Sequence, residues 1–239
     1  MKANRTNRLS RFLYEALVII CSILIAFAIN AWWSNKSDQT QRRSLLVTLN
    51  KDFENSKKQL AELKSNHFKI ERNLERLLIW SDTDTLPENY KIRFDTILGS
   101  IFWRQVFDPT MGTVESIISS SRFDLIKNQK LLSELTKWRA LIENLNEVES
   151  SKINHFYDFL YPYLSAKVSL KDFDKGIPRK VQWNHNLTKA YELLEEPEFL
   201  NLIYMHWVIQ WNINKEIPEV ENTIISILDL SKAELLKYK

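Results

Sequence analysis

The sequence predicts an all-α protein in which one N-terminal transmembrane helix continues into a long helix and then into a helical-bundle soluble domain. Three observations support this. The chain has only three glycines among 239 residues, residues 16–33 carry no charge, and apolar side chains recur at spacings of three and four between 46 and 77. Scarce glycine is unusual for a turn-rich β fold. We expect a basic tail (1–14), a span (15–33) and one helical domain (34–239).

Charge is concentrated beside the apolar run. The tail holds Lys2, Arg5, Arg8 and Arg11 with no acid, and residues 35–80 carry ten basic against six acidic side chains. Basic residues next to a span favour anionic lipid headgroups. Nucleic-acid binding usually places basic and aromatic residues together over a domain face. We therefore expect a lipid bilayer as a partner, and no nucleic acid.

The apolar run has the length of a minimal transmembrane helix. About 18 residues, at roughly 1.5 Å each, nearly cross a hydrocarbon layer of roughly 30 Å. Trp32 and Trp33 close the run, and such rings favour the headgroup level. Arg8 and Arg11 are expected to reach the other interface through their long side chains. These four residues are the predicted membrane-interface anchors.

A cleaved signal peptide is the competing interpretation, because Ala26-Phe27-Ala28 offers an A-x-A site after a basic start. Apolar character continues beyond that site to the tryptophan pair, which favours an uncleaved anchor. Cys21 is the only cysteine, so the chain contains no internal disulfide. Ile20 precedes it where lipidation requires a small residue, so we expect no lipid there.

The orientation follows from the basic residues at the two ends of the span. The tail has four, and residues 34–53 have Lys36, Arg42, Arg43 and Lys51. The tail is short and free of acids, whereas long domains are translocated with little regard to charge. We expect a cytoplasmic N-terminus and a periplasmic C-terminal domain.

Small and polar residues recur on one face of the span. Ser22, Ala26 and Asn30 are four residues apart, a pattern on which membrane helices pack closely and form hydrogen bonds. The alternative is that lipid simply tolerates these residues. The sequence favours neither interpretation over the other.

Residues 37–79 are predicted to form one long helix with a heptad seam, packed as in a coiled coil. A repeat of about 3.5 residues keeps one seam against a partner helix, which is either another helix of this chain or a second copy. Ser56 and His67 fill two seam positions, and His67 is expected in a core or at its rim because no second metal ligand lies at helical spacing. The apolar seam positions are Leu46, Leu49, Phe53, Leu60, Leu63, Ile70, Leu74 and Leu77.

Shorter helices are predicted within the bundle, 88–239. Residues 81–89 form a loop, and a helix over 90–107 ends at Asp108-Pro109, since the residue before proline is pushed out of the helical region. Thr113 is expected to cap a short helix. Asn128 is expected to cap a helix that runs to about Tyr161, where Pro162 stops or kinks it.

The C-terminal part is predicted to hold a loop around 175–178, a short helix near 187–194 and final helices that begin at Pro197. Residues 199–213 are apolar on most faces, which is typical of a helix at the centre of a bundle. Trp207 and Trp211 are expected in its core, or lining a ligand pocket. A second span is disfavoured because the stretch is short and polar residues interrupt it.

The sequence has no P-loop, dinucleotide fingerprint, nucleophile elbow or H-E-x-x-H motif, and its four histidines are scattered. These motifs carry the phosphate-binding, nucleophilic and zinc chemistry that can be recognised from sequence. We expect no enzyme activity, no metal and no cofactor.

The segments SNKSDQTQRRSLLVTLNKDFENSKKQL, GTVESIISSSRFDLIKNQKLLSELTKW and EEPEFLNLIYMHWVIQW carry a resemblance that extends over most of the chain. In these segments the chain resembles a family of uncharacterised single-pass inner-membrane proteins of Gram-negative bacteria. The stretch 113–132 is the most specific part, although Ser121 stands where the family usually has glycine. The resemblance implies topology, fold and an inner-membrane location, and no site residues.

The leading functional expectation is a structural or interaction subunit, joined to itself or to other membrane-protein subunits through the small-residue face and the heptad seam. The second is a periplasmic sensory or ligand-binding domain. The third is a membrane-associated enzyme.

Overall fold

A computed structural model describes residues 3–119, 125–170 and 190–237, without the side chains of residues 3–11 and Ile92. Every regular element in these ranges is helical, and they contain no strand. The all-α prediction is confirmed, and so is one long apolar helix near the N-terminus. Ser121 and the loop expected around 175–178 lie outside the described residues.

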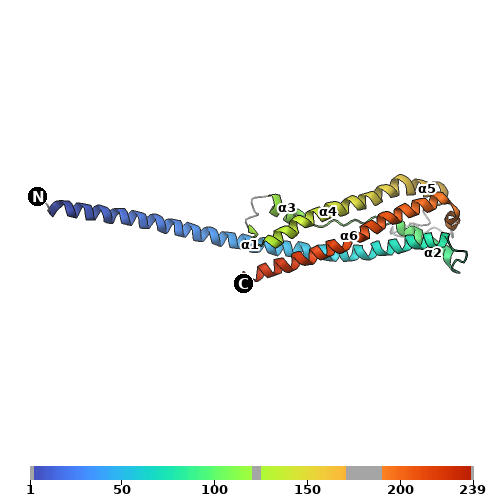
Figure 1. The fold of residues 1–239 in the computed structure, drawn as a ribbon, viewed down its shortest axis with the longest axis horizontal. Helices are drawn as coiled ribbons and strands as arrows, with labels where there is room; N and C mark the ends of the chain where they lie inside the picture. Colours follow the sequence, from blue (N-terminus) through green and yellow to red (C-terminus); the bar gives the residue numbers. More distant parts are fainter. Residues whose placement is uncertain (1–2, 120–124, 171–189, 238–239) are drawn as a thin grey trace, which may run out of the picture.

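The longest element is α1, Ala3–Ser81, which has 79 residues without a break. Its N-terminal part, the arm (residues 12–45), extends away from the rest of the molecule (Figure 1), and only its last residues reach the body, where Leu45 packs against the core. In the described residues α1 is the one helix long and apolar enough to cross a membrane, and none of its apolar window is buried. A signal sequence would pass the same test of length and composition.

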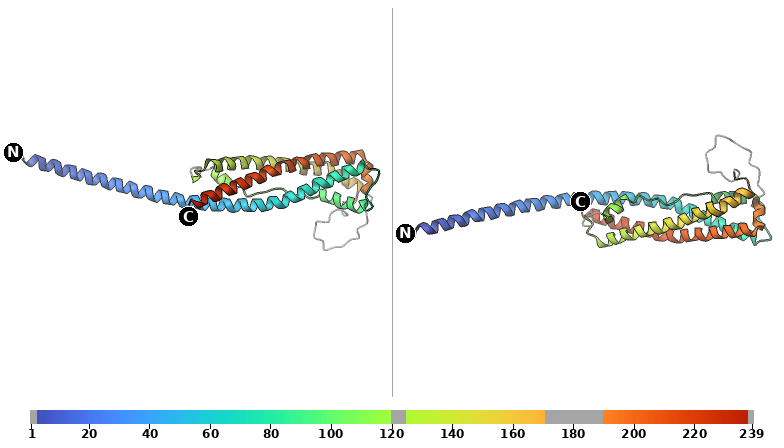
Figure 2. Two further views of the ribbon diagram at one scale, coloured as in Figure 1. Left: turned by 60° about the horizontal axis from the view of Figure 1, so that its bottom comes forward. Right: turned by 90° about the horizontal axis from the view of Figure 1, so that it is seen from above.

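Two further long helices pack against the second half of α1 to form the helical body (46–119, 125–170 and 190–237). They are α4, Gln129–His155, and α6, Pro197–Leu236. α6 is antiparallel to α1, and near the arm the Asn50 amide donates to Ser231 Oγ over 2.9 Å. α4 begins at that same end, where the Asn128 amide donates to Glu234 over 3.0 Å. The C-terminus thus lies close to where the arm meets the body (Figure 2).

The remaining elements are short. They are α2 (Tyr90–Ile101), α3 (Gly112–Ser119), the π-helix η2 (Phe156–Leu160), α5 (Tyr161–Lys167) and the 3₁₀ helix η4 (Ala190–Glu195).

The heptad seam is buried inside this single chain. All eight of its apolar positions are at most 4% exposed, in one cluster shared with α4 and α6 near the arm and a second shared with α2, η2, η4 and α6 at the far end. Of the two partners that the sequence left open, the structure therefore shows the same chain. The expectation that the seam joins other subunits is corrected, because its side chains are already enclosed.

The helix predicted over 90–107 ends early, at Ile101. Residues 103–111, the strap, have no regular structure. The backbone N–H of Phe107 donates to both carboxylate oxygens of Glu149, over 3.2 and 3.0 Å. A distant acceptor thus replaces a helical carbonyl, which the local apolar pattern could not indicate.

The two predicted caps have different outcomes. The Asn128 side chain accepts from the backbone N–H groups of Lys130 and Leu131 over 3.0 and 3.2 Å, so that N-cap is confirmed. Thr113 does not cap α3, which begins one residue earlier at Gly112. Its hydroxyl donates instead to Asp52 of α1 over 2.6 Å, a contact that tertiary packing creates.

The predictions at the prolines are confirmed only in part. Pro162 does not stop the helical path, because the π-helix η2 precedes it and the N–H of Tyr161 reaches back to the carbonyl of Phe156. The wider turn accommodates a proline ring that would clash in a regular α-helix. Pro197 begins α6 as predicted, but the expected final helices are one helix of 40 residues, with Pro218 inside it.

Residues 199–213 are not buried on most faces. Phe199, Ile203 and Ile213 are fully buried, whereas Tyr204 and Trp211 are 51% and 45% exposed. Only one side of α6 packs into the body, and the exposed side of this stretch is also largely apolar, so the prediction of a helix buried on most faces is wrong.

Candidate functional site

A layer of buried polar side chains crosses the middle of the helical body. It comprises His67 on α1, Glu149 and Lys152 on α4, and His206 and Gln210 on α6, each at most 5% exposed. We call these five residues the polar layer. Burying so many polar groups is costly unless they find partners.

The polar layer separates two apolar cores. On α1, Leu63 belongs to the core nearer the arm and Ile70 to the core at the far end, with His67 between them. Leu145 of α4 and Phe156 of η2 bracket Glu149 and Lys152 in the same way. The layer therefore occupies one level of the body, where three helices meet.

Glu149 is the main acceptor in the layer. Besides receiving the strap N–H of Phe107, its Oε1 lies 3.5 Å from His67 Nε2. The carboxylate is thus directed at the strap and at α1, and Phe107 engages both of its oxygens.

His67 is held from three sides. The Gln210 amide nitrogen lies 2.8 Å from Nδ1 and donates to it, so the proton of the neutral ring is on Nε2, facing Glu149. The Trp103 ring of the strap meets the imidazole edge-on, with centroids 5.3 Å apart. Burial lowers the pKa of His67, against the raising effect of Glu149.

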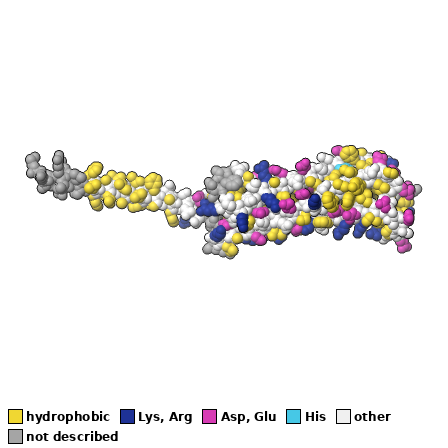
Figure 3. All heavy atoms as spheres, in the orientation of Figure 1, with side chains coloured by type: hydrophobic (Ala, Val, Ile, Leu, Met, Phe, Trp, Pro, Cys, Tyr) yellow, Lys and Arg dark blue, Asp and Glu magenta, His cyan; other side chains and the backbone are white. Residues whose placement is uncertain are grey.

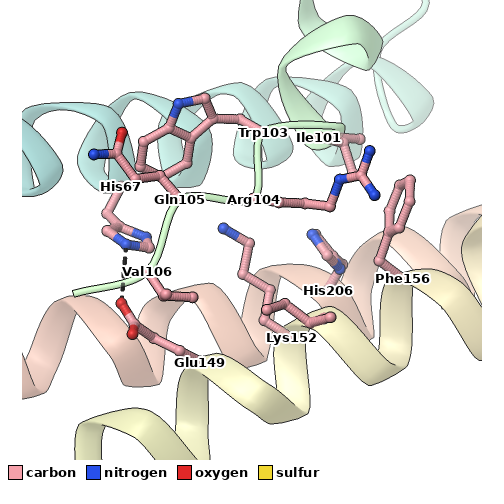
Figure 4. A pocket seen from close by; sticks show the side chains of 11 residues that line it. His67, Ile101, Trp103, Arg104, Gln105, Val106, Glu149, Lys152, Phe156 and His206 are labelled. Carbon is pink, nitrogen blue, oxygen red and sulfur yellow. Dashed lines mark ion pairs between the residues drawn. The ribbon is translucent and has the colours of Figure 1, made fainter. Parts of the chain in front are cut away.

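Lys152 extends from α4 toward the strap (Figure 4). Its ammonium lies 5.5 Å from the centre of the Trp103 ring. Within the described residues it forms no hydrogen bond and no ion pair within 4.0 Å. Burial lowers its pKa to about 8, with the Glu149 charge acting in the opposite direction.

His206 pairs with His155, which is partly buried on α4. Their Nδ1 atoms are 3.2 Å apart. Burial lowers the pKa of both rings, and the charge of Lys152 lowers that of His206 further. On α6, Asn214 lies one turn beyond Gln210, and its amide donates to the Glu71 carboxylate.

The strap and the polar layer, apart from Gln210, line a cavity of about 10 Å³. Its polar lining includes Lys152, His206 and Glu149, and its apolar lining includes Ile153 and Phe156. The space holds about one water molecule. Figure 4 shows the cavity from close by, with the strap passing over the side chains of α4 and α6.

A metal centre has no basis in the part of the chain that the structure describes. No group of three or more His, Cys, Asp or Glu side chains there could hold a metal ion. His155 and His206 bring two ring nitrogens together, but the ammonium of Lys152 acts on the same site and disfavours a further cation.

The predicted membrane-face residues Ser22, Ala26 and Asn30 are all exposed on the arm. The Ser22 hydroxyl donates to the Val18 carbonyl over 2.8 Å, a common arrangement for serine in a helix. Figure 3 shows hydrophobic side chains over the outer part of the arm and polar ones where it approaches the body.

The predicted anchors are likewise on α1. Trp32 and Trp33 are 60% and 67% exposed, and the Lys36 ammonium lies 5.3 Å from the Trp32 ring centre. Arg8 and Arg11 have helical backbones, but their side chains lie outside the described residues.

The two tryptophans of α6 lie in different surroundings. Trp211 is 45% exposed, with the Lys215 ammonium 5.3 Å from its ring centre, so the prediction that it lies in the core is wrong. Trp207 is partly buried against the far core, and its ring centroid is 5.9 Å from that of Tyr204. Neither ring lines the cavity beside the polar layer. Hydrophobic side chains gather on the body surface at the end far from the arm (Figure 3).

Sequence reasoning singled out only His67 from the polar layer. A signal for the rest was present, because Glu149 and Lys152 share the phase of α4 with buried Leu135 and Leu145. Similarly, polar residues recur every fourth position along α6 at 206, 210 and 214, inside an otherwise apolar stretch. Polar residues at the helical spacing of buried apolar residues are therefore the sequence pattern that would have indicated this layer.

A search of family models, of curated proteins and of solved structures found no match to this chain. The family resemblance described above therefore stays a prediction.

Proposed function

We propose that the chain is a single-pass protein of a bacterial inner membrane and acts as a structural or interaction subunit without catalysis. One observation carries the proposal: the exposed apolar part of the arm and the central helix of the body belong to one unbroken helix, α1. With that apolar part in the membrane, α1 would hold the body rigidly, with no flexible linker between them.

The geometry of α1 gives the distance of the body from the membrane. Burial begins at Leu46, which follows Trp33 by thirteen positions. In a continuous helix this interval spans about 20 Å. With the tryptophan pair at the headgroup level, the body stands clear of the lipid and its surface is open to protein partners.

Self-association is proposed within the membrane. Ser22, Ala26 and Asn30 form the small-residue face of the arm. Thr48, which follows Asn30 by about five turns of about 3.6 residues, is exposed on the side of α1 away from the seam. Two copies that met through the small-residue face would therefore keep their polar outer surfaces, not their cores, toward each other.

The test compares Ala26→Ile with Ala28→Ile in the full chain in detergent. The two changes are identical in chemistry and lie on opposite sides of the helix. We expect Ala26→Ile to weaken self-association at least about tenfold, or about 1.4 kcal/mol, and Ala28→Ile to leave it unchanged. Equal behaviour of the two variants in sedimentation would show that the arm is a simple tether.

The orientation is part of the proposal: the N-terminus is cytoplasmic and the helical body periplasmic. The basic tail supports it through Lys2, Arg5, Arg8 and Arg11. Alkaline phosphatase fused after Lys239 should be active, since that enzyme needs the periplasm to form its disulfides. An active cytoplasmic reporter at the same position would overturn the orientation.

A sensory role is the second candidate, and the polar layer favours it. His67 lies on α1, so a change in the layer acts on the helix that continues into the arm. Copurification from native membranes, with the partners identified by mass spectrometry, separates the two roles. Stoichiometric membrane subunits favour the structural role, and a signalling protein favours the sensory one. A membrane-associated enzyme is the third candidate.

A further inference from the structure

Lys152 has an unusual position for a lysine. It is 5% exposed, and Figure 4 shows its ammonium among the residues that line the cavity under the strap. An ammonium group has three N–H donors, and the Lys152 Nζ is not among the fully enclosed side-chain atoms that lack a partner, so solvent in the cavity reaches it. Among the described residues, the side chain has no hydrogen-bond acceptor and no ion-pair partner. An acceptor in the cavity would complete this site.

The surroundings of Lys152 add positive charge and donors. The guanidinium of Arg104, also in the cavity wall, lies 5.8 and 5.1 Å from the ring centres of Phe156 and Tyr157. The buried Nε2 of His206 has no hydrogen-bond partner among the described residues. Lys152, Arg104 and His206 all line the same cavity, with the exposed Arg104 guanidinium on the side of Phe156.

The acid in the cavity wall does not neutralise Lys152 by direct contact. Glu149 is more than 4.0 Å from the ammonium, beyond the limit for an ion pair, and Phe107 and His67 engage its carboxylate. With Glu149 ionised, Lys152 and Arg104 leave the site with one positive charge in excess. A water molecule would satisfy donors but would not balance that charge.

We propose that the cavity binds a single halide-sized monovalent anion, held by the Lys152 ammonium with Arg104 beside it. The size of about 10 Å³ excludes anions as large as sulfate or phosphate, and a monatomic halide, which is wider than water, fits only if the exposed strap side chains move outward. Arg104, Gln105 and Val106 of the strap are exposed, so the anion enters past residues that belong to no helix. Strap and anion then lock α1 and α4 together at the level of the polar layer.

The experiment measures thermal unfolding of the full chain in detergent while sodium chloride or bromide replaces sodium gluconate at constant ionic strength. Gluconate is too large for the cavity. We expect Tm to rise with the logarithm of the halide concentration, by about 5–10 °C once the halide exceeds its Kd about a hundredfold. No rise above that in gluconate would show that the cavity holds water alone and would overturn the proposal.

Lys152→Met is the decisive variant. It removes a buried charge and keeps an apolar chain of similar length, so we expect it to fold and to lose the halide-dependent rise. Lys137→Met on the same helix is the matched control, because the Lys137 side chain is 47% exposed and paired with Glu219 at 3.0 Å. It should keep the full rise. A wild-type response in Lys152→Met would place the halide elsewhere and refute the site.

A second readout is independent of stability. The linewidth of the chloride NMR signal should broaden with wild-type protein, return to the buffer value when bromide competes, and show no such broadening with Lys152→Met. Broadening that is equal in the variant would likewise refute the site.

Discussion

The Nδ1 atoms of His155 and His206 lie 3.2 Å apart across the interface between α4 and α6. At this distance one nitrogen donates and the other accepts, so at least one of the two rings must be neutral. Burial lowers the pKa of both rings, and Lys152 repels a proton from His206. The interface therefore favours the neutral form of both histidines.

The first prediction is a loss of stability in mild acid. The folded pKa of His206 is depressed, and an unfolded histidine titrates near 6.5, so the unfolded chain binds more protons below that pH. The stability from His206 is complete above about pH 6.5 and is lost as pH falls below it, by up to about 1.4 kcal/mol per pH unit. Denaturant unfolding from about pH 7.5 to about pH 5 measures the slope.

His206→Gln is the control for this slope, since an amide cannot titrate in the range. The variant should lose a large part of the pH dependence, while His155 and His67, whose pKa values burial also lowers, retain the rest. An unchanged slope in His206→Gln would contradict the assignment.

The second prediction concerns the buried charge of Lys152. Its pKa of about 8 lies below the ordinary value of 10.5, so the unfolded chain binds more protons between these values. Wild-type stability should therefore rise as pH increases through that window. In gluconate buffer near neutral pH, Lys152→Met should be about 1–3 kcal/mol more stable than wild type and lack this rise. If Lys152→Met were less stable than wild type in this buffer, burial of the Lys152 charge would not destabilise the fold, and the prediction would be refuted.

The third prediction tests the coupling of Glu149 to its neighbours. Glu149→Gln should destabilise by about 2–4 kcal/mol, because it weakens the acceptor of the Phe107 N–H and leaves Lys152 without a nearby negative charge. The gain in stability from Lys152→Met should be at least about 1 kcal/mol larger in the Glu149→Gln background than in the wild type. Strict additivity in this double-mutant cycle would show that the two charges do not interact.

The features that could be predicted from sequence are those encoded by neighbours in the chain. The period of the seam from Leu46 to Leu77 follows from one helix, and the Asn128 cap bonds to residues two and three positions away. Such patterns are local, so composition and spacing reveal them.

The features that sequence missed depend on distant contacts. The strap leaves the helical conformation where Glu149, 42 residues away, accepts the N–H of Phe107. His67 meets Gln210 across 143 residues of sequence. The sequence shows polar residues at helical positions that are otherwise apolar. It does not show how α1, α4 and α6 are aligned, so it could not indicate which of these residues contact each other.

The fourth prediction tests whether the seam is internal. Leu63 is fully buried, and Leu63→Ala should cost about 2–5 kcal/mol of unfolding free energy. Because its neighbours belong to the same chain, that loss should be the same at low and at about tenfold higher protein concentration. A loss that shrinks as concentration rises would indicate that a second copy completes the seam.

The unbroken α1, with its arm in the membrane, is the central claim. Its most direct test is the intact mass and the location of the mature chain in the cells that naturally produce it. Both are measured after the membranes have been washed with alkali. We predict a chain in the membrane pellet whose mass includes residues 1–28. A shorter chain that begins after Ala28 and is recovered in the soluble periplasmic fraction would contradict it.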